Sequence, residues 1–125
     1  MRVRIAAVTA VTALGLAGAA MASTNGSAAQ PKLIGKVGIN NAYKISLKLP
    51  NGKTVKTLKS GFYKLTVTDG SNIHNFQIEG PGLDKRVTTV NYKGTKTVTV
   101  HLRKGKYKFY CMPHESQMFG FFKVT

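Results

Sequence analysis

Apolar and polar residues alternate with a period of two along most of the chain after residue 42. In the segment 43–49 two lysines and a serine separate four apolar residues, a pattern typical of a strand with one buried face. Similar segments, bounded by turns rich in Gly, Pro, Asn or Asp, predict further strands. They are expected over residues 53–58, 62–68, 73–79, 85–91, 95–102, 107–111 and 118–124. Because no later segment has the period of a helix, the pattern predicts an all-β chain folded as an antiparallel β-sandwich.

The turn signal Pro50-Asn51-Gly52 lies between the segments 43–49 and 53–58. A turn of this composition between two extended segments is typical of a hairpin. We therefore expect these two strands to pair with each other.

The alternation also assigns side chains to the faces of each strand. His74 shares the apolar face of its segment with Phe76, and Cys111 ends a strand on the same inward face as Phe109. His101 falls on the face that is expected to meet solvent. The residues on the face opposite His74 are Ile73, Asn75 and Gln77.

The first 22 residues have the pattern of a helical signal peptide. Two arginines precede an apolar run over residues 5–20, which is shorter than the roughly 20 residues that a membrane-spanning helix needs. The small residues Ala20 and Ala22 favour cleavage after Ala22, and a second small-residue site allows cleavage after Ala29. We expect a signal peptide over 1–22, a flexible leader over 23–32 and one domain over 33–125, exported to the periplasm or the cell exterior.

Positive charge dominates the polar positions. The chain has 19 Lys and Arg against four Asp and Glu, a formal net charge of +15, and +13 remains without Arg2 and Arg4 of the signal peptide. Such a charge attracts acidic partners. Nucleic acid is not expected, because an exported chain without an arginine-rich helix or a base-stacking motif is unlike proteins that bind it. We expect an acidic docking surface on a partner protein and, second, peripheral contact with an anionic membrane surface.

The chain contains one cysteine, Cys111. No intramolecular disulfide can therefore form, although small exported domains often depend on disulfides. An unpaired thiol in an oxidising compartment is open to oxidation, and binding as a metal thiolate protects it. A buried, inert cysteine is the alternative interpretation.

Three groups that bind soft metals stand in one short loop with the spacing Cys-x-x-His-x-x-x-Met. Thiolate and thioether sulfurs prefer Cu(I), and imidazole binds either oxidation state of copper. A type 1 copper site needs two His and one Cys in a plane with a distant Met on the axis. The chain predicts one copper ion, cycling between Cu(I) and Cu(II), held by His74, Cys111, His114 and Met118. This prediction requires the strand of His74 to lie beside the strand of Cys111.

Each of these ligands has an ordinary structural role when it is considered alone. His74 would be a hydrogen-bonded core residue, Met118 would fill a gap and Cys111 would be a small apolar side chain. Their coincidence in one set of ligands favours copper. His101, which is expected to face solvent, and Met112, which the spacing does not need, are left out of the site.

Two other uses of Cys with His are less consistent with the chain. A structural zinc site takes four N, S or carboxylate ligands, usually with several Cys, and Met is a poor zinc ligand. A thiol nucleophile needs a His base, an orienting group and an oxyanion hole, and no such motif is present. The four acidic residues are scattered, so paired carboxylates for acid–base catalysis are missing as well. We do not expect an enzyme.

Short motifs make the chain similar to small type 1 copper proteins, the cupredoxins of the plastocyanin and azurin type. They are SNIHNF at residues 71–76, GPG at 80–82, and YCMPH at 110–114 with MFG at 118–120. The resemblance covers nearly the whole domain and implies a Greek-key β-sandwich with one metal near one end. It implies the same four ligands, and it implies that Asn75, which follows the first His, belongs to the hydrogen-bonded surroundings of the thiolate.

The resemblance implies a monomeric one-electron carrier between redox partners. His114 would carry electrons outward across an apolar surface formed by Met112, Pro113 and Phe119. The alternative is a copper carrier or buffer in copper homeostasis, without an electron relay, because the same ligands would serve it. A third hypothesis is an exported adhesion domain that binds no metal.

Overall fold

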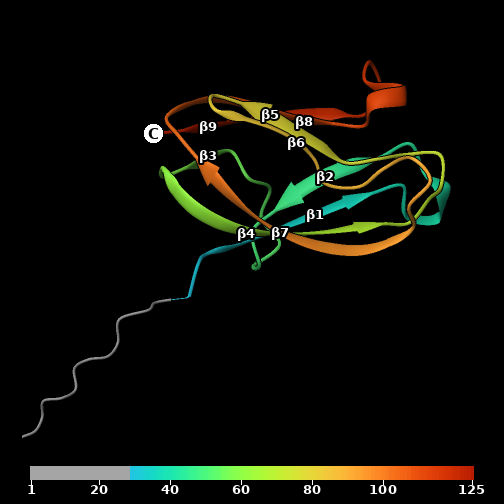
Figure 1. The fold of residues 1–125 in the computed structure, drawn as a ribbon, viewed down its shortest axis with the longest axis horizontal. Coiled ribbons are helices and arrows are strands. Elements are labelled where there is room, and N and C mark those ends of the chain that lie inside the picture. The colour runs from blue at the N-terminus through green and yellow to red at the C-terminus, as the bar shows by residue number, and fades with distance from the viewer. Residues whose placement is uncertain (1–28) are drawn as a thin grey trace, which may run out of the picture.

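Two β-sheets pack face to face in the protein (Figure 1). The structure, a computed structural model, describes residues 29–125, so the predicted signal peptide and residues 23–28 of the predicted leader lie outside the described residues. One sheet has the order β2-β1-β4-β7, with β1 (Lys32–Val37), β2 (Ile45–Lys48), β4 (Gly61–Asp69) and β7 (Gly94–Leu102). The other has the order β3-β9-β8-β5-β6, with β3 (Thr57–Leu58), β5 (Gln77–Gly80), β6 (Leu83–Arg86), β8 (Gly105–Tyr110) and β9 (Phe119–Val124).

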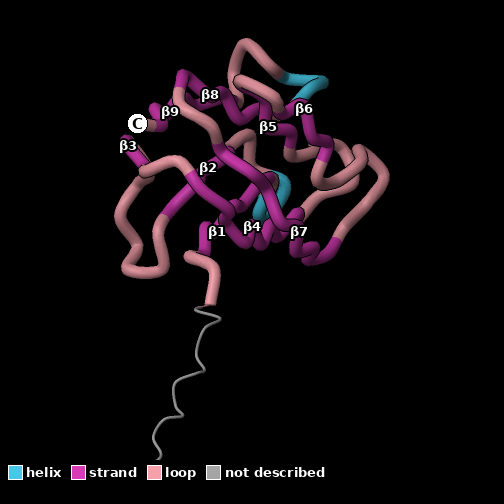
Figure 2. The backbone as a smooth tube through the Cα atoms, turned by 60° about the vertical axis from the view of Figure 1, so that its left-hand side comes forward, coloured by secondary structure: helices cyan, strands magenta, loops and turns pink. Residues whose placement is uncertain are grey.

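Helical structure in the described part of the chain is confined to two short 3-10 turns, Ile39–Asn41 and Met112–His114 (Figure 2). Between residues 29 and 125 no helix has the length and apolar character needed to cross a membrane. The predicted all-β sandwich is therefore confirmed.

The sheets are mixed, whereas the alternation predicted antiparallel pairing throughout. β1 runs parallel to β4, and β3 runs parallel to β9, while the remaining strand pairs are antiparallel. Parallel neighbours cannot be joined by a tight turn, because the chain must first return to the starting end of the sheet. Between β1 and β4 the chain makes this return through β2 and β3, so the parallel pairs follow from a crossing between the sheets.

The predicted hairpin over residues 43–58 forms only at its turn. Lys48 and Thr54 make one isolated bridge, and the Val55 N–H donates to the Leu47 carbonyl at 3.0 Å. The chain then leaves the first sheet, and β3 pairs with β9 of the second. Val55 and Leu58 are both buried. The crossing therefore places their apolar side chains between the sheets, where a continued hairpin would not place them.

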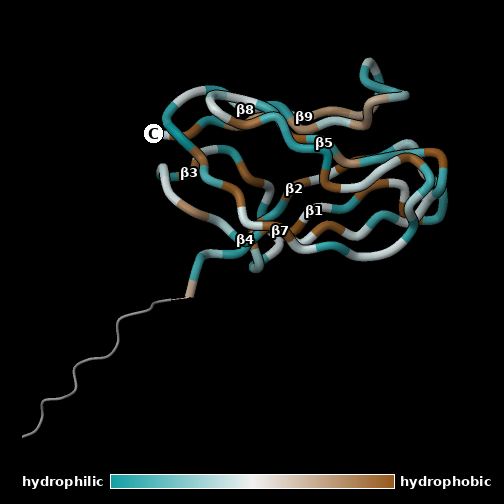
Figure 3. Tube along the Cα trace, viewed as in Figure 1, coloured by the Kyte–Doolittle hydropathy of each residue, from teal (hydrophilic) through white to brown (hydrophobic). Residues whose placement is uncertain are grey.

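The period-two alternation predicts the buried face correctly in the long strands. In β4 the side chains of Tyr63, Leu65 and Val67 are buried, and in β7 His101 is exposed as expected. Hydrophobic residues recur along the strands of both sheets (Figure 3), and the buried ones form the core. The largest side chains of this core that are almost completely buried are Leu33, Leu47, Leu65, Phe76, Ile78, Leu102, Tyr107 and Met118.

The alternation is wrong in the predicted strand 73–79. Only residues from Gln77 onward belong to a strand, and Asn75 and Gln77, which were assigned to the face opposite His74, are buried like it. Residues 74–76 are not part of a ladder, so successive side chains need not alternate between a covered and an open face.

The pairing of β5 with β8 brings the predicted ligands together. Gln77 lies opposite Tyr110 in this antiparallel pair. His74 precedes β5 by three residues and Cys111 follows β8 directly, so both reach the same end of the sandwich. In Figure 1 the loop after β8 lies at the end far from the C-terminus. The prediction that the segments carrying His74 and Cys111 are neighbours is therefore confirmed.

Candidate metal centre

A sulfur and two ring nitrogens converge beyond the ends of β5 and β8. Cys111 Sγ lies 3.6 Å from Nδ1 of His74 and 3.6 Å from Nδ1 of His114, and the two Nδ1 atoms are 3.1 Å apart. His74 and Cys111 are fully buried, and His114 is half-buried. Three side chains from two separate segments thus direct their ligand atoms at one small space.

The space between these atoms has the size of a metal ion. A point equidistant from the corners of this triangle lies about 2 Å from each, close to the length of a metal–imidazole bond. One thiolate and two imidazoles in a plane are the donor set of a type 1 copper site. Within residues 29–125 no further His, Cys, Asp or Glu joins the cluster, so the four-ligand set of a structural zinc site is not present.

The loop 111–118 is held in shape by its own backbone. The Cys111 N–H donates to the Met118 carbonyl at 3.0 Å, which ties the two ends of the loop together. The His114 N–H donates to the Cys111 carbonyl at 3.1 Å, and the Met118 N–H donates to the His114 carbonyl at 2.9 Å. Pro113 stands in the first turn of the short helix between them and limits the backbone further. The predicted spacing therefore corresponds to a closed ring that carries three of the four predicted ligands.

Met118 is buried at the end of this ring. Its backbone carbonyl accepts the hydrogen bond from the Cys111 N–H, so the two residues are neighbours. Met112 is 40% exposed. His101 lies far along β7, where its ring stacks on Phe62 with centroids 4.3 Å apart. The structure brings together His74, Cys111 and His114, and it keeps His101 away from them.

A buried network of hydrogen bonds positions the segment that carries His74. The Thr88 hydroxyl donates to Asp69 Oδ2 at 2.7 Å and accepts from the Phe76 N–H at 2.9 Å. The Ser71 N–H donates to the other oxygen of Asp69 at 3.1 Å. The network thus connects the residues on both sides of His74. Sequence reasoning missed Asp69 as part of the site, because the pair Asp69-Gly70 was interpreted only as a turn signal.

Gly38 lets the first sheet approach this segment closely. Its φ of 63° lies in the left-handed region, and a Cβ there would stand 2.8 Å from His74 Cδ2 and 2.8 Å from Ser71 Cβ. Such a contact is closer than carbon atoms tolerate. A residue without a side chain is therefore required where the β1–β2 loop meets the histidine.

Asn75 connects the two segments of the centre. Its backbone N–H donates to Cys111 Sγ at 3.5 Å, and its side-chain Oδ1 accepts from the Met112 N–H at 2.6 Å. The resemblance implied this position beside the sulfur. The hydrogen bond to Met112 orients the loop that carries Cys111 relative to the segment that carries His74.

Tyr43 is a neighbour of the centre that the alternation did not indicate. Its ring packs edge to face against both imidazoles, with centroids 4.7 Å from His74 and 4.6 Å from His114. The only sequence signal was an aromatic residue at the start of an alternating segment. Which rings it would meet depends on the position of the β1–β2 loop in the fold.

Burial favours the neutral forms of the Cys111 and His74 side chains. It raises the pKa of the Cys111 thiol, and the N–H groups of Asn75 and His114 oppose this shift. It lowers the pKa of the His74 imidazole, an effect that the backbone of Asn41 opposes. A neutral imidazole is ready to bind a metal, whereas the thiol must release its proton. Full burial and a raised pKa also make Cys111 a poor nucleophile.

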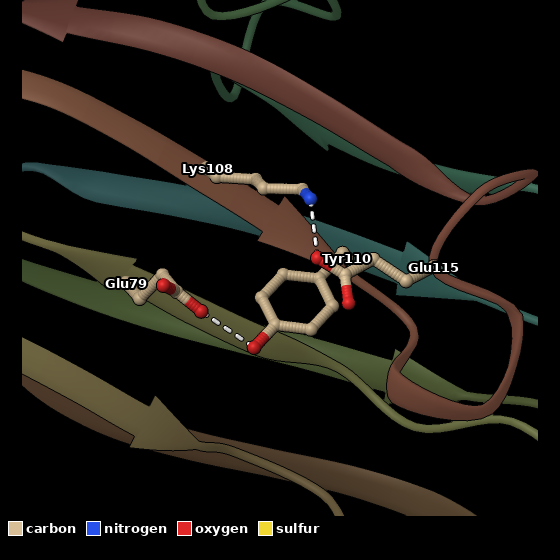
Figure 4. A network of polar contacts seen from close by, with 4 residues as sticks. All are labelled: Glu79, Lys108, Tyr110 and Glu115. Carbon is tan, nitrogen blue, oxygen red and sulfur yellow. Dashed lines mark hydrogen bonds and ion pairs between the residues drawn. The ribbon is translucent and has the colours of Figure 1, made fainter.

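Tyr110 precedes Cys111 and takes part in a polar network on the outer side of the sheet (Figure 4). Its hydroxyl donates to Glu79 Oε1 at 2.5 Å. Beside it, Lys108 forms an ion pair with Glu115, the residue after His114. The hydrogen bond to Glu79, followed by burial, raises the pKa of Tyr110.

A family described as copper binding proteins, plastocyanin/azurin family, matches residues 42–125. No curated protein sequence matches the chain. Among solved structures the chain is similar to rusticyanin from Thiobacillus ferrooxidans, with 20% identity, 79% of each chain covered and a TM-score of 0.50. A methionine-to-glutamine variant of rusticyanin gives 18% identity, covers 79% of this chain and 80% of its own, and has a TM-score of 0.54. At these identities the structural likeness shows the shared fold.

Replacing Asn75 with alanine should lower the stability of the metal-free protein. The Met112 N–H loses its acceptor, and an unsatisfied group at a partly buried position reduces the free energy of unfolding by about 1–3 kcal/mol. Urea unfolding of the metal-free protein measures this loss. Asn72→Ala is the matched control, because Asn72 is exposed. An equal effect of both substitutions would contradict the role given to Asn75.

Replacing Tyr110 with phenylalanine should make stability less sensitive to alkaline pH. Unfolded tyrosine loses its proton near pH 10, whereas folded Tyr110 holds it to higher pH. The unfolded state therefore binds fewer protons, and wild-type stability falls as pH rises above about 10. Urea unfolding at a series of pH values from about 8 to 11 gives the slope of the free energy of unfolding against pH for each protein. Coinciding slopes for wild type and Tyr110→Phe would show that this tyrosine does not contribute.

Proposed function

The chain belongs to the plastocyanin/azurin family of copper-binding proteins, and we propose that it holds one copper ion as a type 1 centre and passes single electrons between redox partners. Its cofactor is copper. The observation that carries the proposal is the triangle of two Nδ1 atoms and one Sγ, formed by two buried side chains and one half-buried one, with no carboxylate of the described residues among them. Bound in this set, copper supplies a one-electron couple that needs little change in geometry.

Four side chains would hold the ion in this proposal. His74, Cys111 and His114 would supply two imidazoles and a thiolate. Met118 would add its thioether as the weaker fourth ligand, since it ends the ring of the ligand loop and is buried there. The sulfur of an axial Met is a weak, distant ligand in such centres.

The chain's own contacts support electron transfer by keeping the ligands in place. Backbone hydrogen bonds close the loop 111–118, and the Asn75 side chain connects it to the His74 segment. The Asn75 N–H also donates to the sulfur, which favours its charged form. Ligands that do not need to rearrange fit both oxidation states with little reorganisation.

His114 is the proposed exit for electrons. It is half-buried, whereas His74 and Cys111 are completely buried. Exposed apolar side chains stand near it in the sequence, with Met112 40% and Phe119 47% exposed. A ligand at the surface among apolar groups lets a partner approach without displacing tightly held water.

The proposed setting is outside the cytoplasm, either the periplasm or the cell exterior. The signal-peptide pattern of residues 1–22 supports this proposal. The proposed partner is a redox protein with an acidic surface, since the charge of the chain attracts acidic groups over distances of about 8–10 Å at moderate salt. No enzymatic activity is proposed.

Adding Cu(II) to the purified domain should produce the intense colour of thiolate-to-copper charge transfer. Cys111→Ala should abolish this colour, because it removes the thiolate. His101→Ala is the matched control, since His101 is exposed and distant from the centre. Absorption spectra recorded during a copper titration measure the charge-transfer band of each protein. A wild-type protein that stays colourless and indifferent to copper would refute the proposed function.

Repeated reduction and oxidation of the copper-loaded protein should leave the metal in place. A relay keeps its ion through many cycles, whereas a copper carrier or buffer releases it to an acceptor. Cycling with ascorbate and ferricyanide in the presence of a Cu(I) chelator, followed by absorbance, measures retention. Transfer of most of the copper to the chelator within one cycle would favour the carrier function instead.

A further inference from the structure

The sandwich has two open edges, and the one formed by β2 and β9 lies beside the metal centre, where Tyr43 packs against His74 and His114. β2 ends the first sheet, and β9 is joined to β3 only at Lys123 and Val124. The first residues of β9 therefore face β2 without a strand between them. A groove with a volume of about 460 Å³ follows this edge. The opposite edge is formed by β6 and β7.

Three lysines line the groove. Lys36 comes from β1, Lys48 from β2, and Lys44 directly precedes β2. All three are exposed. Lys36 lies opposite Ser46, which also lines the groove. The groove is therefore a concave surface with three positive charges on neighbouring strands.

No carboxylate of the chain neutralises these lysines. All four acidic residues lie within the described part of the chain and none lines the groove. Asp69 is buried and bonded to Thr88, and Asp84 accepts a hydrogen bond from the Gln77 side chain. The other two bind Tyr110 and Lys108 on the outer side of β8 (Figure 4). The negative charges that complement these lysines must therefore come from another molecule.

The same groove carries exposed apolar side chains. Ile39, Tyr43 and Phe119 line it, and they are 39%, 51% and 47% exposed. Large apolar side chains grouped with charges at their margin are typical of a protein interface. A flat membrane surface does not fill a concave groove, and a second copy of this chain would bring lysines to lysines.

Tyr43 connects the groove to the metal centre. It lines the groove and its ring packs against the rings of both His74 and His114. A partner seated in the groove would therefore touch a side chain in contact with two of the proposed copper ligands. This route differs from the exit through half-buried His114.

We infer that the groove between β2 and β9 is the docking site for an acidic segment of a redox partner. Its carboxylates would pair with Lys36, Lys44 and Lys48, and an apolar side chain would rest on Tyr43 and Phe119. The inference rests on the proposed function for the nature of the partner. The groove itself is testable with a peptide, in the metal-free protein as well as in the copper-loaded one.

The test uses the peptide Glu-Glu-Phe-Glu-Glu, blocked at both ends, and the ¹⁵N-labelled protein in its reduced, copper-loaded form. Amide signals of β2 and of the start of β9 should shift during NMR titration. The triple variant K36Q/K44Q/K48Q should bind the peptide about tenfold more weakly, because three exposed ion pairs are lost. The peptide Gln-Gln-Phe-Gln-Gln should bind at least as weakly to the wild type.

The matched control is K85Q/K93Q/K104Q, which removes the same charge from exposed positions on β6, the loop before β7 and the turn before β8. It should bind the acidic peptide within about twofold of wild type. Equal weakening in both triple variants, or shifts centred on residues 112–114, would overturn the inference. So would stronger groove-dependent binding to phosphatidylserine vesicles than to the peptide.

Copper spectra of the same variants separate this inference from the proposed function. Both triple variants should keep the charge-transfer colour, because none of the replaced lysines belongs to the centre. If the wild type binds no copper, the proposed function fails, while the peptide titration of the metal-free protein still decides whether the groove binds acidic segments.

Discussion

The antiparallel pairing of β5 with β8 is the constraint on which the centre depends. It places Gln77 opposite Tyr110 and so brings the residues before one strand and after the other to the same end. A slip of one residue would turn every side chain of a strand to the other face. The ligand loop alone could then supply only one imidazole to the sulfur of Cys111. The second imidazole, that of His74, reaches Cys111 because β5 pairs with β8.

Burial and hydrogen bonding act together at this end of the sandwich. Removing His74, Cys111 and Asp69 from water disfavours their charged forms. The chain offsets this penalty with directed hydrogen bonds, from Thr88 to Asp69 and from Asn75 to the sulfur. These contacts also fix the positions of the ligands, so that the arrangement suited to a metal ion is built by the chain itself.

Charge is distributed unevenly around the centre. Glu79, Asp84 and Glu115 are bonded on the side formed by β5, β6 and β8, and Asp69 is buried at the end of β4. No carboxylate of the chain pairs with the lysines of the groove beside β2. A partner can thus reach the end of the sandwich that holds the metal centre by two routes. One passes half-buried His114, and the other passes Tyr43, which touches both imidazoles.

The sequence by itself determined what depends on neighbouring residues. The spacing of Cys111, His114 and Met118 indicated one loop, and alternation indicated the inner faces of the long strands, because both are local properties of the backbone. Only the tertiary structure decided the parallel strand pairs, the crossing of residues 53–58, the burial of Asn75 and the contacts of Tyr43. These features depend on which distant segments become neighbours, and period-two patterning is the same for many strand orders.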